Sequence, residues 1–408
     1  MGIGIKTEYN KFRIFMVAYW AMMLSVTGMY TMYIVQAGFS KKEISIAVMI
    51  FTFSSLIGQN LIGYLADRFK CVKKILFISI SIGIIVTATL IFSRQSLYIN
   101  ILIFLWGFFL YGTVPLSEAW YIKVLKTNGD QKDFGKIRGF GSIGYGISGV
   151  ILGLLLQNFG WSIYSWYIII SACFVLLVIL MMSESKGIAL YKVSGDHKGD
   201  IGNISLKEAL YEIIGIKPLR LIIIIVFIYS FVAKGIYSYL GVLVSDFGGG
   251  ALNLGLAYFF DATPEVITFF LTTRLLSKYR SKGLIFAAFI LQIVRLSLIL
   301  VFNSPLSIIL LGSLSGFAYG LLASAYKTYI YELAPEKYKI SCLSLSESII
   351  GLSGVISAIV FGFVIMKFGG YTSIAMGLAI DIAAALFLAG NLLKERERER
   401  KSESERTH

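Results

Sequence analysis

Apolar residues along this chain occur in long, nearly unbroken runs separated by short polar segments. A helix that crosses a bilayer needs about 20 mostly apolar residues, and the runs reach that length. A closed β-barrel, the other fold that spans membranes, has weakly alternating segments of about ten residues instead. The pattern therefore predicts an all-α membrane protein with twelve membrane-spanning helices, at residues 12–35, 44–66, 74–93, 97–123, 134–157, 161–182, 219–245, 251–276, 283–302, 305–332, 341–366 and 371–393.

Two polar segments divide the chain into larger units. Residues 183–218 mix Gly, Lys, Asp and Glu with only a modest apolar pattern, which predicts a cytoplasmic linker. It separates an N-terminal six-helix bundle, residues 1–182, from a C-terminal six-helix bundle, residues 219–393. The last segment, residues 394–408, is a run of mixed charge that predicts a solvated cytoplasmic tail. We expect no separate soluble domain.

Composition and charge agree with this class of protein. The chain has 57% hydrophobic and 15% charged residues, and its mean hydropathy is +0.78, which excludes an ordinary soluble protein. Most Lys and Arg residues follow even-numbered spans or lie in the termini, whereas Lys41, Lys42, Arg94 and Lys367 fall on the other side. By the positive-inside rule both termini are cytoplasmic in a cell membrane. Topology thus accounts for the net charge of +14 without a nucleic-acid partner.

Charged residues inside the predicted spans are the main functional signal, because a charge in the membrane is costly and marks function by default. Glu118 in the fourth span and Arg138 in the fifth are joined by a short basic loop. The pair is either part of a binding site or an ion pair that only joins two helices.

The second half carries its own charges. Lys234 lies in the seventh span, Asp261 and Glu265 lie four residues apart on one face of the eighth, and Arg295 lies in the ninth. A buried lysine must pair or lose its proton, and Asp261 and Glu265 are the expected partners. Burial also disfavours the charged form of a carboxyl group, so Asp261 or Glu265 is expected to be the group that takes up a proton.

Nothing in the sequence indicates an enzyme. No nucleophile with a neighbouring base, phosphate-binding loop or metal cluster is found, and the two histidines, His197 and His408, lie outside the predicted spans. We expect no cofactor and no metal site.

The loop after the second span contains the motif GYLADRFKCVKK. Its charged and small residues are Gly63, Asp67, Arg68, Lys73 and Lys74. An acid near a helix end can pair with a base or a helix N-terminus, and such a pair is expected to act as a cytoplasmic gate. The motif resembles the signature of the major facilitator superfamily. The resemblance implies two pseudo-symmetric bundles that rock around a site near the middle of the membrane. The corresponding loop of the second half, RLLSKYRSKGLIF, resembles this motif less closely and has Ser277 in place of Asp67.

Two further patterns, P-x-x-E-A-W and F-G-x-x-R-x-F-G-S-x-G-Y, resemble the lactose permease, nucleoside and phenylpropionate proton symporters of that superfamily. The resemblance implies that Glu118 accepts hydrogen bonds from the substrate, Arg138 donates them, and Tyr145 offers an apolar face. The tenth span departs from the lactose permease, because Ser315 and Ala318 stand where that protein has its His and Glu.

We therefore predict import of a small polar organic solute, such as a sugar or nucleoside, by proton symport through alternating access. The predicted substrate-binding residues are Glu118, Arg138, Tyr145, Lys234 and Arg295; the predicted proton-coupling residues are Asp261 and Glu265. We expect a monomer in the lipid bilayer. The alternatives are proton-coupled efflux of a drug or metabolite, which the missing glycine-proline motif disfavours, and a receptor or scaffold without transport.

Overall fold

The computed structural model describes residues 2–92, 95–128, 134–182, 215–335 and 339–406. Most of the predicted linker, at 183–214, therefore lies outside the described residues. Within them every regular element is a helix. The main helices are α1 (Gly2–Thr27), α2 (Tyr30–Gln36), α3 (Lys41–Phe69), α4 (Val72–Ala88), α5 (Ser96–Leu105), α6 (Val114–Asn128), α7 (Phe134–Phe159), α8 (Ile163–Met181), α10 (Lys217–Ser238), α11 (Leu240–Asp246), α12 (Ala251–Phe302), α13 (Pro305–Leu333) and α14 (Lys339–Arg406).

Two of these helices turn back on themselves. α12 changes direction at Arg280 (φ 54°, ψ 152°), and α14 does so at Gly369 (φ 85°, ψ 172°), a conformation that glycine adopts readily. Nine helical segments of the described chain are long and apolar enough to cross a membrane. Counting both arms of α12 and of α14, and including the shorter α4, the described residues make the twelve crossings that the sequence predicts. Beyond the last crossing α14 continues as a helix to Arg406.

Three spans that the sequence predicts as continuous are interrupted. The first breaks between α1 and α2 at Gly28, where an added Cβ would lie 2.8 Å from the Tyr258 ring. The fourth contains a π-helical turn at Trp106–Leu110, and the seventh breaks between α10 and α11 at Tyr239. π-helical turns are often found at functional sites. Residues at these breaks contact other helices, as Gly28 contacts Tyr258 and the Tyr239 hydroxyl donates to the Ala358 carbonyl, and the hydropathy pattern does not contain such contacts.

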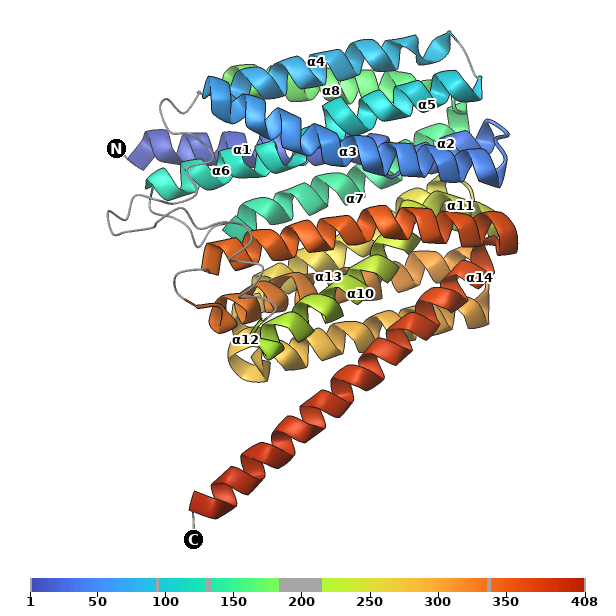
Figure 1. Ribbon diagram of the computed structural model, residues 1–408. Helices are drawn as coiled ribbons and strands as arrows, with labels where there is room; N and C mark the ends of the chain where they lie inside the picture. Colours follow the sequence, from blue (N-terminus) through green and yellow to red (C-terminus); the bar gives the residue numbers. More distant parts are fainter. Residues whose placement is uncertain (1, 93–94, 129–133, 183–214, 336–338, 407–408) are drawn as a thin grey trace.

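The helices form two halves, α1–α8 and α10–α14, which lie one above the other in Figure 1. We call the end where the N-terminus lies the terminal side, and the end where α2 and α11 lie the far side. The halves are in contact through α2 with α11, α3 with α14, and α7 with α12. Glycines allow the closest approach: a Cβ added at Gly149 would lie 2.7 Å from the Gly255 carbonyl oxygen. The far side is therefore closed by direct helix packing.

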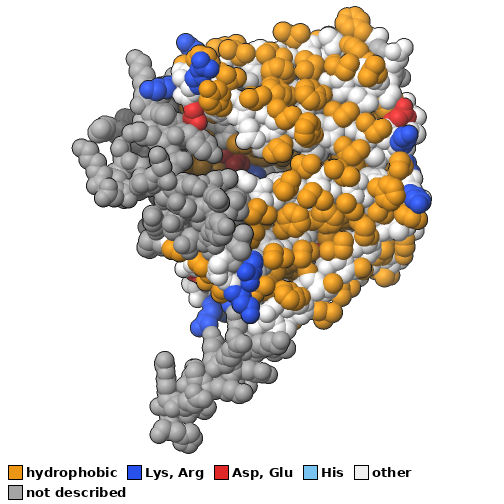
Figure 2. Space-filling model, viewed as in Figure 1, with side chains coloured by type: hydrophobic (Ala, Val, Ile, Leu, Met, Phe, Trp, Pro, Cys, Tyr) orange, Lys and Arg blue, Asp and Glu red, His pale blue; other side chains and the backbone are white. Residues whose placement is uncertain are grey.

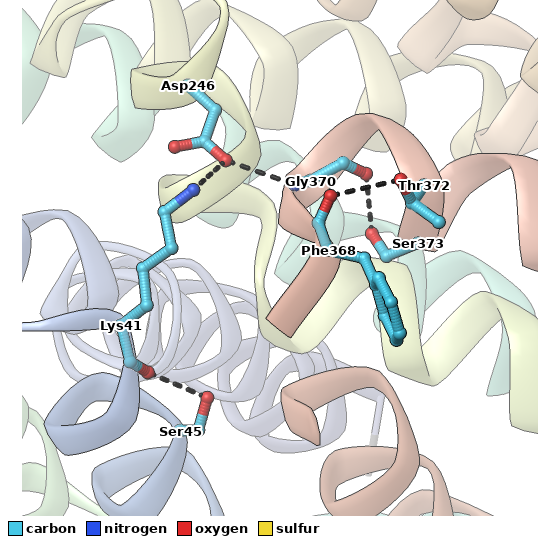
Figure 3. A network of polar contacts seen from close by, with 7 residues as sticks. All are labelled: Lys41, Ser45, Asp246, Phe368, Gly370, Thr372 and Ser373. Carbon is cyan, nitrogen blue, oxygen red and sulfur yellow. Dashed lines mark hydrogen bonds and ion pairs between the residues drawn. The ribbon is translucent and has the colours of Figure 1, made fainter. Parts of the chain in front are cut away.

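Polar contacts reinforce this closure, as Figure 3 shows. Lys41 at the start of α3 forms an ion pair with Asp246 at the end of α11, with 2.8 Å between Nζ and Oδ2. The same oxygen accepts a hydrogen bond of 3.2 Å from the Gly370 backbone N–H, just after the turn in α14. Deeper between the halves, the Ser45 hydroxyl donates to the Gly362 carbonyl at 3.0 Å. At the terminal side, in contrast, Figure 2 shows a hollow between the halves with acidic and basic side chains inside it.

Candidate functional site

Arg138 of α7 contacts an acidic residue from each half of the protein. Its Nε lies 3.4 Å from Glu118 Oε1 of α6, and its Nη2 lies 3.8 Å from Glu265 Oε1 of α12. The guanidinium carbon lies 4.4 Å from the centre of the Trp20 ring, a cation–π contact from α1. The Arg138 side chain is only 16% exposed, whereas Glu118 is 33% exposed. One cation is thus held between two carboxylates from opposite halves, and one of these carboxylates faces solvent.

A cluster of aromatic side chains surrounds Tyr145, further along α7. Tyr145 is seven residues from Arg138, which is about two helical turns. The Tyr237 hydroxyl donates to the Tyr145 hydroxyl at 2.8 Å, and Thr27 lies 3.2 Å away on the other side. The Tyr145 ring makes edge contacts with Trp20 and with Tyr258, at centroid distances of 6.1 and 5.6 Å. Because Tyr237 and Tyr258 belong to the C-terminal half, these aromatic contacts join the two halves.

Asp261 and Glu265 lie on the first arm of α12, as the four-residue spacing predicts, but they have different neighbours. Glu265 contacts Arg138 of the N-terminal half. Asp261 lies close to Arg295 and to the Ser315 hydroxyl. Arg295 is almost fully buried, and its Nε makes no hydrogen bond to any described residue. The structure therefore separates two pairs, one between the halves and one inside the C-terminal half.

Lys234 has partners other than the predicted Asp261 and Glu265. Its Nζ donates a hydrogen bond of 2.6 Å to the Ile350 carbonyl of α14. Glu347, one turn earlier on α14, is the acidic residue within electrostatic range. Glu347 in turn accepts hydrogen bonds from Tyr326 and from Lys327 Nζ, the latter at 2.9 Å. The reason is geometric, because α10 packs against α14 rather than turning this face toward α12.

Tyr319 of α13 is a site residue that the sequence analysis missed. Its hydroxyl is within electrostatic range of Arg138, Glu118, Glu265 and Glu347, and its side chain is 48% exposed. Trp20 and Tyr237 join it as aromatic groups beside the charges. No sequence signal distinguishes these three from the many other aromatic residues of the chain, because what marks them is contact between helices.

A second buried acid lies apart from this cluster. Asp381, in the second arm of α14, is completely buried, and its Oδ2 accepts a hydrogen bond of 2.7 Å from the Gln292 amide of α12. Its other oxygen, Oδ1, has no hydrogen-bond partner among the described residues. A buried carboxyl group with a single neutral donor depends strongly on that donor.

Replacing Gln292 by leucine is therefore expected to destabilise the protein by about 1–3 kcal/mol, because the buried Asp381 carboxyl group loses its one hydrogen bond to a described residue. The measurement is the midpoint of thermal unfolding in detergent. The double variant with Asp381→Leu should recover part of the loss, since it removes the unsatisfied group. An unchanged midpoint for Gln292→Leu would show that this hydrogen bond does not stabilise the C-terminal half.

The predicted gate residues flank the tight turn between α3 and α4, with Gly63, Asp67 and Arg68 near the end of α3 and Lys73 and Lys74 at the start of α4. Lys70 takes the left-handed conformation that ends α3. Lys73 Nζ donates to the carbonyls of Leu180 and Met182 at the end of α8, at 3.2 and 2.6 Å. A Cβ added at Gly63 would meet no atom within 4 Å, so the close contact that glycine permits is not made in this conformation.

The other gate residues lie at the same end of the molecule. The Arg68 guanidinium lies 5.9 Å from the Phe69 ring centre, and Lys74 is exposed. Asp67 is partly buried at the end of α3. The motif thus joins the ends of helices within the N-terminal half, on the side where the hollow is.

Twelve crossings in two halves, closed on one side and hollow on the other around a buried charge cluster, define a membrane transporter. The chain belongs to the MFS_1-like family, which matches residues 9–375. It is 22% identical over 256 residues to the maltose permease of Geobacillus stearothermophilus, and the match spans 62% of this chain and 61% of that protein's length.

Solved structures show the same fold. The nucleoside transporter NupG superimposes with a TM-score of 0.74 at 15% identity, over 94% of this chain and 98% of that one. The POT family transporter PepTSo superimposes with a TM-score of 0.66 at 14% identity, over 95% and 98% of the two chains. The family match over residues 9–375 and the shared fold make the protein a multi-pass membrane transporter of the major facilitator type.

Proposed function

We propose that this transporter imports a small polar organic solute, a sugar or a nucleoside, together with a proton. The observation that carries the proposal is the position of Arg138 between Glu118 of its own half and Glu265 of the other half. A cation that can change carboxylate partners connects solute binding to the relative position of the halves. The names of a maltose permease and a nucleoside transporter among the relatives support this class of solute.

The binding residues are assigned by their chemistry. Glu118 is the most solvent-accessible member of the charge cluster and accepts hydrogen bonds from solute hydroxyls. Arg138 donates a fork of hydrogen bonds to the solute. Trp20 and Tyr145 offer ring faces to the apolar side of a sugar or base. Lys234 and Arg295, whose contacts are with α14 and with Asp261, stay proposed binding residues of the C-terminal half.

Proton coupling is assigned to Glu265, with Asp261 as the second acid. When Glu265 loses its charge by taking up a proton, its attraction for Arg138 falls, and Arg138 becomes free to bind solute with Glu118. Asp261 and Arg295 form a second pair in the C-terminal half that responds to the first, because Asp261 and Glu265 lie on one face of α12. The terminal side is cytoplasmic, and the protein acts as a monomer in the cell membrane.

The test is uptake of labelled sugars and nucleosides into proteoliposomes with an imposed pH gradient. We expect an acidic exterior to drive accumulation, and a protonophore to abolish it. Glu265→Gln should still exchange solute across the membrane but should no longer accumulate it. Accumulation that a protonophore leaves unchanged would refute proton coupling. Outward flux driven by the same gradient would indicate an efflux antiporter, and absence of flux for any solute would indicate a receptor.

A further inference from the structure

A second group of charged residues lies toward the terminal side of the C-terminal half. Glu347, near the start of α14, accepts hydrogen bonds from the Tyr326 hydroxyl and from Lys327 Nζ of α13, the latter at 2.9 Å. The side chains of Glu347 and Lys327 are 47% and 55% exposed. An ion pair this exposed contributes little to stability, because water competes for both charges. The Glu347 carboxylate is therefore accessible to a ligand.

Tyr319 connects this group to the cluster around Arg138. Its hydroxyl is within electrostatic range of Arg138 and Glu118 and also of Glu347. Tyr326 lies seven residues further along α13, about two helical turns or 10 Å, and it is within electrostatic range of Tyr319. Residues seven apart share one face of a helix. One face of α13 thus leads from the Arg138 cluster to Glu347.

Lys234 of α10 adds a buried cation to this second group. Its Nζ donates to the Ile350 carbonyl at 2.6 Å, and Glu347 is the acidic residue within its electrostatic range. A Cβ added at Gly354 would lie 3.1 Å from Lys234 Cδ, so the lysine side chain is packed against α14. An ionised carboxylate accepts hydrogen bonds roughly twice as strong as those of a neutral acceptor. The second group is therefore suited to bind solute hydroxyl groups.

We propose that Glu347 and Tyr319 form a second subsite, which binds the end of the solute remote from Arg138. This inference rests on the proposed uptake of sugars or nucleosides and narrows the solute to one with hydrogen-bonding groups at both ends. Two linked sugar rings, or a sugar joined to a base, contact both groups of residues, whereas a single ring contacts one. Solute hydroxyls replace Lys327 as donors to the Glu347 carboxylate.

The experiment is equilibrium binding to the purified full chain, which does not require transport. Two pairs of probes are titrated by calorimetry, maltose against glucose and uridine against uracil. We expect the two-ring member of a pair to bind more tightly than its single ring. Glu347→Gln should weaken binding of the two-ring probe about tenfold, the loss of one hydrogen bond to a charged group, and should leave the single-ring probe unchanged.

Two further variants show whether the effect belongs to the subsite. Glu332→Gln is the matched control, because it makes the same chemical change at an exposed position near the end of α13, and it should bind both probes like the wild type. Tyr319→Phe removes the hydroxyl and keeps the ring, so it should weaken the two-ring probe by a smaller factor than Glu347→Gln.

Equal affinities of the one-ring and two-ring probes, or unchanged two-ring binding by Glu347→Gln, would overturn the second subsite and leave the proposed uptake intact. An equal loss for both probes in Glu347→Gln would overturn it as well. The selective loss, together with accumulation that a protonophore leaves unchanged, would support the subsite and refute proton coupling. Absence of binding by all four probes would refute the proposed solute class and the subsite with it.

Discussion

Arg138→Gln is expected to lower the initial rate of solute uptake by about a hundredfold or more. The variant leaves Glu118 and Glu265 facing each other across the two halves without the cation that lies between them. A hydrogen bond to a charged group contributes about 1.5–3 kcal/mol, and 1.4 kcal/mol corresponds to a factor of ten, so the loss of two such contacts reaches this size. The measurement is uptake into proteoliposomes at equal amounts of inserted protein.

Two further variants show whether the effect belongs to the site. Arg138→Lys keeps the charge but loses the planar fork of donors, so it should retain part of the activity. Arg274→Gln removes an exposed arginine from α12, six residues before the change of direction at Arg280, and should transport like the wild type. Normal uptake by Arg138→Gln would mean that the ion pair only joins helices, which is the alternative that the sequence leaves open.

Gly255→Leu is expected to abolish uptake by a different route. A Cβ at this position would overlap the backbone of Gly149 in the other half, so the halves could not close on the far side. Overpacking of a tight contact costs about 1–3 kcal/mol, and here opening the far side relieves it. Spin labels at Lys42→Cys and Thr372→Cys, on the two halves at the far side, should therefore be several ångströms further apart in the variant.

The matched control for this steric effect is Gly283→Leu. Gly283 lies on the second arm of α12, and a Cβ added there would meet no atom within 4 Å. This variant should transport solute and keep the label distance of the parent protein. If Gly255→Leu keeps the parent distance, the Gly149–Gly255 contact does not control closure of the far side; if the distance grows but the rate is kept, the transport cycle does not require the closed far side.

The number of crossings could be predicted from sequence because hydropathy reports how each helix meets lipid. The positions where helices break could not be predicted equally well. The turn of α14 has a local sequence signal, because Gly369 adopts a positive φ readily. The turn of α12 has none, because Arg280 takes a positive φ that its side chain disfavours. The break at Gly28 makes room for the Tyr258 ring of the other half, which is a tertiary cause.

Part of the candidate site could likewise be predicted from the sequence, and part could not. The motifs around Glu118 and Arg138 predict their proximity, and the structure places them 3.4 Å apart. The contact of Arg138 with Glu265 depends on how the halves are positioned at one stage of the cycle, and no motif encodes it. The partner of Lys234 could not be predicted from the sequence, because it is the backbone carbonyl of Ile350 and a backbone group has no sequence signature.

The most direct test of the proposed site is substrate protection of a cysteine at Tyr319, beside Arg138 and Glu265. In a background with Cys71, Cys173 and Cys342 replaced, alkylation of Tyr319→Cys is compared with alkylation of Tyr331→Cys, an equally exposed position on the same helix (48% and 50% exposed). We predict that a transported solute slows alkylation at position 319 at concentrations near its KM and leaves position 331 unchanged. Equal rates with and without solute at both positions would contradict a binding site between Glu118, Arg138 and Glu265.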